Sequence, residues 1–234
     1  MSISQQLLFF FSALGAFNGV LLALYFFFLK PKALSNYFLA AMLLMLSVRI
    51  FKSVIFYFDD ELAKIYLQLG LSAFFFVGPF LYLFIRSKFS LTKSWLSWQI
   101  HLAILFIFIT SIGIIFPYQS NPEVWYLILK VISYQWLFYI LLSAYTLRHE
   151  FLRLVYKKEK FHEDDIWLLS VFFGNVIIWL AHFTAAYTSY IVGALSFSFV
   201  FYLSFLVVVF HRRKMGALKM VKYADKKIII SEAE

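Results

Sequence analysis

The sequence has no cysteine, only four prolines and eight glycines, and few charged residues. Without cysteine, the chain has no disulfides, no thiolate nucleophile and no thiolate metal ligand. Only 14% of its residues are charged and 63% are apolar, whereas soluble domains are roughly half apolar and about a quarter charged. A 234-residue chain of this composition cannot hide its apolar surface from water, so we expect its solvent to be lipid.

Catalytic and metal-binding patterns are also lacking. The sequence contains no HExxH, GxSxG, P-loop or GxGxxG pattern, and no positioned acid and base pair stands in its apolar stretches. The run His162-Glu163-Asp164-Asp165 has metal-ligand chemistry, but Asp164 and Asp165 directly precede an apolar run, where carboxylates cap free N–H groups. We therefore expect no enzyme, no cofactor and no metal site.

Seven apolar runs are long enough to cross a membrane. A helix of about 20 residues spans the roughly 30 Å hydrocarbon layer at about 1.5 Å per residue. The predicted spans are residues 7–29, 36–58, 65–85, 99–116, 125–147, 166–187 and 190–210. The sequence thus predicts an all-α integral membrane bundle of seven transmembrane helices in residues 1–210, followed by a basic cytoplasmic tail or linker in residues 211–234.

The distribution of lysine and arginine predicts the orientation. Seventeen of the 21 lie on one side of the predicted membrane and only Lys64 lies on the other, while three fall inside spans. Because basic short loops stay in the cytoplasm, we expect the N-terminus outside and the C-terminus inside. The net charge of +9 follows from this topology, and the 24 residues after Phe210 are too few for a helix-turn-helix. We expect the basic tail to meet membrane lipids rather than nucleic acid.

Arg49 is the charge placed deepest in a predicted span. Lys52 and Ser53 follow at helical spacing and share its face. A charge at mid-membrane costs at least about 2.5 kcal/mol, so it normally has a polar partner. All twelve acidic residues lie outside the spans. Either carbonyls, waters, Asn18 or Asn175 satisfy Arg49, or an anionic group such as a small carboxylate or lipid headgroup binds in an outward-facing pocket.

Other polar residues lie at comparable depth in the outer half of the predicted bundle. Lys52 and Lys130 either extend to the outer headgroups or face a shared pocket. We take five residues as candidate ligand-binding groups: Arg49, Lys52, Gln68, Lys130 and His182. His101 is expected to form interfacial hydrogen bonds. Pro79 after Gly78 predicts a kink, which is tolerated where a neighbouring helix satisfies the freed carbonyl.

Three segments carry a resemblance to a known family. The first is ALGAFNGV at 13–20 running into SNYFLA at 35–40, and the second is GPFLY at 78–82 with Arg86-Ser87 and then His101 opening the next helix. The third is KYADKK at 222–227 through EAE at 232–234. Together they resemble the N-terminal membrane region of bacterial membrane-anchored transcriptional regulators with a C-terminal AraC-type helix-turn-helix domain.

This resemblance implies a sensor in the bacterial inner membrane that controls a cytoplasmic DNA-binding domain and acts as a dimer. Because the sequence stops at Glu234, we expect the DNA-binding domain, or a separate partner protein, beyond that residue. The alternative is a small transporter or channel for an anionic or amphipathic solute. Transporters built of repeated units show matched broken helices, and only Pro79 interrupts a span here.

Overall fold

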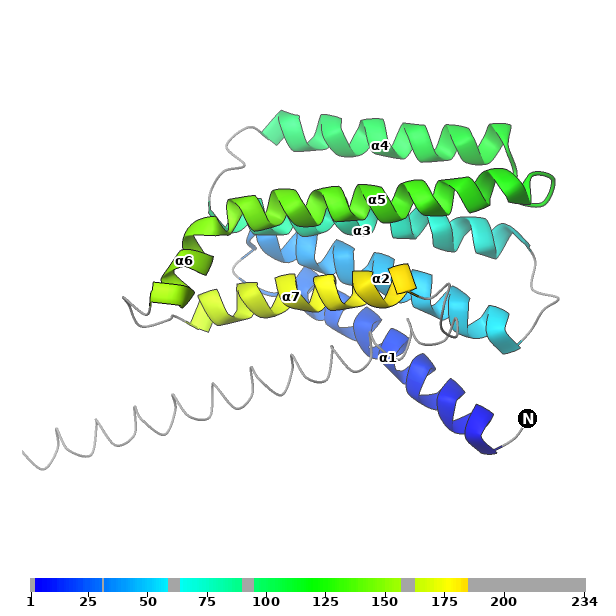
Figure 1. Cartoon of the computed structure of the whole chain (residues 1–234), viewed down its shortest axis with the longest axis horizontal. Coiled ribbons are helices and arrows are strands. Elements are labelled where there is room, and N and C mark those ends of the chain that lie inside the picture. Colours follow the sequence, from blue (N-terminus) through cyan, green and yellow to red (C-terminus); the bar gives the residue numbers. More distant parts are fainter. Residues whose placement is uncertain (1–2, 31, 59–63, 90–94, 157–162, 185–234) are drawn as a thin grey trace, which may run out of the picture.

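The structure is a computed structural model, and it describes residues 3–30, 32–58, 64–89, 95–156 and 163–184 (Figure 1). Within these residues all regular structure is helical and no strand occurs. The helices are α1 (Ile3–Phe28), α2 (Leu34–Phe58), α3 (Lys64–Lys88), α4 (Trp95–Ile115), α5 (Pro122–Thr146), α6 (Arg148–Tyr156) and α7 (Glu163–Phe183).

Six of these helices, all except α6, are long and apolar enough to cross a membrane. The chain is therefore an all-α, multi-pass membrane protein, and its first six predicted spans each coincide with one of these helices. The seventh predicted span, 190–210, and the tail, 211–234, lie outside the described residues. Asp164 and Asp165, which were expected to cap the start of the sixth predicted span, lie in the first turn of α7.

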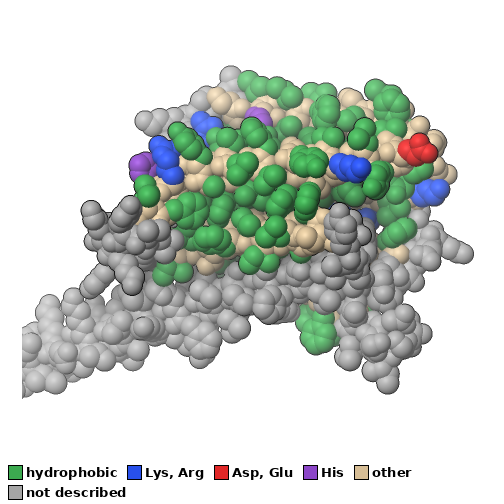
Figure 2. Space-filling view, viewed as in Figure 1, with side chains coloured by type: hydrophobic (Ala, Val, Ile, Leu, Met, Phe, Trp, Pro, Cys, Tyr) green, Lys and Arg blue, Asp and Glu red, His purple; other side chains and the backbone are tan. Residues whose placement is uncertain are grey.

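Helix α3 is the centre of the bundle. It packs against α2 on one side and α5 on the other, while α1 lies against α2, α7 against α5, and α4 along the edge beside α3 (Figure 1). Of the six long helices α3 is the most buried and α4 the least. Figure 2 shows apolar side chains across the middle of one face and most of the charged ones near its two ends, as expected of a surface that meets acyl chains.

The Gly78-Pro79 step allows α3 and α5 to approach closely. Pro79 has no N–H to donate to the carbonyl of Phe75 one turn earlier. Gln135 of α5 takes that role, since its Nε2 donates to the Phe75 carbonyl over 3.1 Å. A Cβ on Gly78 would lie 3.1 Å from the Trp136 Cα, which is tighter than ordinary contact. The structure thus identifies the neighbouring group that satisfies the carbonyl freed by the proline.

Helix α6 was not expected from the sequence. After α5 ends, the chain turns and α6 runs across one end of the bundle toward the start of α7 (Figure 1). Phe151 of α6 packs against Phe172 and Phe173 of α7, with ring centroids 5.5 and 5.9 Å apart. This contact holds α6 against the middle of α7.

Candidate functional site

Arg49 and Ser53 form a hydrogen-bonded pair on the inner face of α2. The Arg49 side chain is buried, with 3% of its surface exposed. Its Nη1 donates to the Ser53 Oγ over 2.9 Å, and that hydroxyl in turn donates to the Arg49 carbonyl over 2.9 Å. Because the two residues are one turn apart, the helix itself holds the serine where it fixes part of the guanidinium.

Lys52 lies beside this pair and is also buried. Its aliphatic stem crosses the flat surface of Gly70 on α3, where an added Cβ would lie 2.9 Å from the Lys52 Cγ and 3.1 Å from its Cε. The ammonium nitrogen is 6.0 Å from the ring centroid of Phe56, one turn closer to the end of α2. Gly70 therefore provides the space through which a lysine can run between two closely packed helices.

Phe74 of α3 connects Arg49 to α5 and α7. The Arg49 Cζ is 5.1 Å from the Phe74 ring centroid. The same ring meets Trp136 of α5 edge-to-face at 5.1 Å and His182 of α7 at 5.0 Å. A cation over an aromatic face is worth about 2 kcal/mol or more where both are shielded from water. The aromatic groups thus help to hold the guanidinium in the interior of the bundle.

Two further polar atoms stand at the same place. The His182 Nε2 and the Trp136 Nε1 are both buried and have no hydrogen-bond partner among the described residues. Arg49 and His182 both contact the Phe74 ring. A guanidinium, an ammonium and an indole N–H are hydrogen-bond donors only, and a histidine nitrogen can also donate. The set is therefore rich in donors, and its chemical complement is a group that carries acceptors and negative charge.

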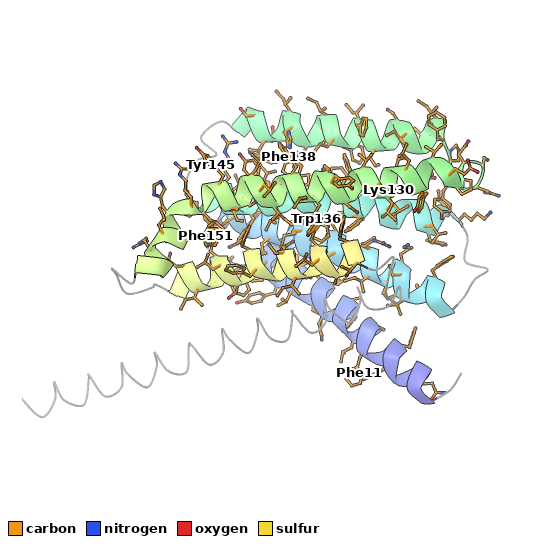
Figure 3. All side chains as sticks on the ribbon, in the orientation of Figure 1. Phe11, Lys130, Trp136, Phe138, Tyr145 and Phe151 are labelled. Carbon is orange, nitrogen blue, oxygen red and sulfur yellow. The ribbon has the colours of Figure 1, made fainter. Side chains whose placement is uncertain are left out.

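Gln68 and Lys130 do not join this set. The Gln68 Nε2 donates to the Gly113 carbonyl over 3.1 Å, and its Oε1 accepts from the Tyr118 N–H over 2.9 Å, so its amide holds the end of α4. Lys130 lies on the exposed side of α5, with its Nζ 4.7 Å from the Tyr126 ring centroid (Figure 3). Of the five candidates, the structure brings together Arg49, Lys52 and His182.

Two other expected polar groups have structural partners. Asn175 of α7 is buried and its Nδ2 donates to the Val171 carbonyl over 3.0 Å, while lying 3.6 Å from the Met42 sulfur. His101 is 2.8 Å from the Tyr139 hydroxyl through its Nε2, which links α4 to α5 by the hydrogen bond expected of it.

Sequence reasoning missed Phe74 and Trp136, which contact the buried polar groups, and Gly70, which makes room for Lys52. In a chain with 31 phenylalanines and six tryptophans, an aromatic residue in a span carries no distinguishing signal. Gly70 becomes informative only when Lys52 is seen against it. We refer below to Arg49, Lys52, Phe74, Trp136 and His182 as the cationic cluster.

A scan against protein-family models found no match to this chain, and searches of curated proteins and of solved structures found none either.

Proposed function

We propose that this bundle is the membrane-embedded sensory and anchoring module of a bacterial transcriptional regulator in the inner membrane. In this proposal the cationic cluster detects an anionic, amphipathic molecule, and the chain passes the signal to a cytoplasmic DNA-binding output. The observation that carries the sensory part is that Arg49 of α2 and His182 of α7 contact the same Phe74 ring, with the buried Lys52 following Arg49 on α2. The resemblance of segments 13–20, 78–82 and 222–227 supports the regulatory part.

The chemistry of the cluster favours a ligand with a charged head and an apolar body. Arg49 offers the bidentate geometry that a carboxylate or phosphate accepts. Phe74 and Trp136 offer aromatic faces next to it, and Trp136 adds a buried N–H donor. A fatty-acid-like carboxylate or an anionic lipid would use both parts.

The location of the cluster supports a way of passing on the signal. Arg49 belongs to α2, whereas His182 stands in the last turn of α7, just before the seventh predicted span. A ligand held between them would favour one spacing of α2 and α7 over another, and a ligand shifts an equilibrium only through such a difference in binding. The following segment and the basic tail would then carry the change to the cytoplasmic side.

The test is a set of thermal melts in detergent or nanodiscs, with a panel of fatty acids, small carboxylates and anionic lipids. A ligand at a hundredfold excess over its Kd stabilises the folded state by about 2.7 kcal/mol, which raises the melting midpoint by on the order of 5–10 °C. We expect Arg49→Leu to remove this ligand-induced rise and to leave the bundle folded, because removing a buried charge need not destabilise the protein. Arg49→Lys should weaken the rise, since the bidentate contact is lost.

Lys130→Leu is the matched control, because it removes one cation from the exposed side of α5. It should keep the ligand-induced rise. If no anion raises the wild-type midpoint, while Arg49→Leu alone lowers it, the arginine is a structural group and the sensory proposal is wrong.

A second measurement distinguishes a sensor from a transporter. Proteoliposomes are loaded with the anion that stabilises the protein best, and its movement across the membrane is followed with time. A sensor binds the anion without moving it. Flux that depends on Arg49 would instead assign the cluster to transport.

A further inference from the structure

A stripe of exposed side chains runs down one side of α5. Tyr134, Phe138, Leu141 and Tyr145 follow each other at helical spacing, and each has more than half of its surface exposed. Figure 3 labels Phe138 and Tyr145 on this helix. On a helix that crosses a membrane, such a stripe faces acyl chains, and its last aromatic residue marks the level of the headgroups. Tyr145 therefore places the end of α5 at a membrane boundary.

Arg148 begins α6 at the end of this stripe. Its Cζ lies 4.4 Å over the Tyr145 ring, and its Nη1 donates to the Tyr145 carbonyl over 3.1 Å. Both side chains are exposed. The ring contact and the hydrogen bond hold the guanidinium at this level, and its planar fork matches the oxygens of a phosphate.

The rest of α6 has one side packed on protein and one side exposed. Phe151 packs on α7. The buried Glu150 forms an ion pair with Arg153, with 3.0 Å between Oε2 and Nη1. Leu152 lies one turn after Arg148 on the outer side, with 52% of its surface exposed. This short helix lies at the end of the membrane spans and has basic residues and an exposed leucine. These are the features of an interfacial helix.

We propose that Tyr145, Arg148 and Leu152 form a surface that binds anionic phospholipids in the leaflet at this end of the bundle. Arg148 takes the headgroup phosphate, Tyr145 lies beside the first part of the acyl chains, and Leu152 enters the boundary between the two. The sequence continues with Lys157, Lys158 and Lys160, and basic residues that follow a span favour anionic over neutral lipid. This proposal does not depend on the cationic cluster or on its ligand.

The cysteine-free chain allows a direct test. Leu152→Cys carries a spin label, and the protein is placed in nanodiscs of phosphatidylcholine alone or mixed with phosphatidylglycerol. Collision with oxygen reports lipid, and collision with a nickel chelate reports water. We expect the ratio of oxygen to nickel accessibility to be several-fold higher at Leu152→Cys than at Gln119→Cys, which labels an exposed turn at the opposite end, and to rise further with phosphatidylglycerol.

Arg148→Gln in the labelled protein should abolish the rise caused by phosphatidylglycerol. Lys130→Gln, which makes the same change in net charge near the other end of α5, should leave it intact. The same midpoint of thermal unfolding as the parent shows that each variant is folded, and a label at the exposed His149 serves if Leu152→Cys fails this check. Equal accessibility at Leu152→Cys and Gln119→Cys would overturn the proposal. A ratio that is the same in both lipid mixtures, or a rise that survives Arg148→Gln, would overturn it too.

Discussion

At the scale of single residues, Gly70 determines where the Lys52 side chain lies. An alanine Cβ at position 70 would meet the Lys52 Cγ at 2.9 Å, in the stem of the side chain rather than at its flexible end. Lys52 would have to move, and with it the charge that it contributes to the cationic cluster. The glycine therefore affects the proposed ligand site although it has no chemistry of its own.

We predict that Gly70→Ala destabilises the protein by about 1–3 kcal/mol, which is the usual cost of overpacking a tight interior. In a Lys52→Ala background the same change should cost less, because the Lys52 Cγ and Cε that the new methyl group would meet are gone and only the Cβ, 3.0 Å away, remains. A double-mutant cycle of melting midpoints in detergent measures the difference. Equal costs in both backgrounds would show that the Lys52 side chain beyond its Cβ does not limit the space at Gly70.

At the scale of the helices, Gln135 compensates for Pro79. The proline leaves the Phe75 carbonyl without its helical donor, and the Gln135 amide supplies one from α5. A carbonyl left unsatisfied in an apolar interior costs about 1–3 kcal/mol. The interruption in α3 and the close α3–α5 contact are therefore parts of one arrangement.

We predict that Gln135→Leu destabilises the bundle by about 1–3 kcal/mol. In a Pro79→Ala background the effect should shrink toward zero, since the substituted alanine restores the N–H that the Phe75 carbonyl lacked. Melting midpoints of the two single variants and the double variant give the coupling. Ser133→Ala is a suitable control, because its hydroxyl donates to the Leu129 carbonyl within its own helix. If Gln135→Leu destabilises the protein equally in the Pro79→Ala background, the amide does not act by satisfying the Phe75 carbonyl.

The sequence could predict the first six long helices because length and continuous hydrophobicity are enough to identify a span. It could not predict which face of each span points inward. Helices such as α4 and α5 are apolar on all sides, so no 3.6-residue pattern marks an inner face. The sequence predicts similar membrane depths for Gln68, Lys130 and His182. Only the packing of the helices shows that His182 lies in the cationic cluster and that the other two do not.

Helix α6 was missed for a related reason. It has nine residues, several of them charged, so a search for long apolar runs treats it as a connector. The contact that holds it in place is made by Phe151, which packs on α7. Contacts of that kind are not visible in a single sequence. The same holds for Phe74 and Trp136, whose roles come from neighbours on other helices.

At the scale of the whole molecule, the ends of the bundle differ in charge. Arg86, Lys88, Arg148 and Arg153 lie at the end where α3 and α5 finish and α7 begins, while Lys64 lies at the opposite end (Figure 1). The helices arrange these residues as the predicted topology requires. Which end faces the cytoplasm remains a prediction from the charge bias.

We predict that fusions after Lys88, Lys160 and Lys227 place a reporter in the cytoplasm, and that a fusion near Pro122 places it outside. Green fluorescent protein fluoresces only when it folds in the cytoplasm, and alkaline phosphatase is active only outside, so each position gives two opposite readouts. Lys160 and Lys227 flank the predicted span 190–210 and the helix α7 before it. Two crossings between them return the chain to the same side, whereas a single crossing would put Lys227 outside. External activity at Lys227 with cytoplasmic activity at Lys160 would therefore remove the seventh span. The reverse pattern at all four positions would keep the bundle and invert its orientation, because the charge bias alone assigns the side.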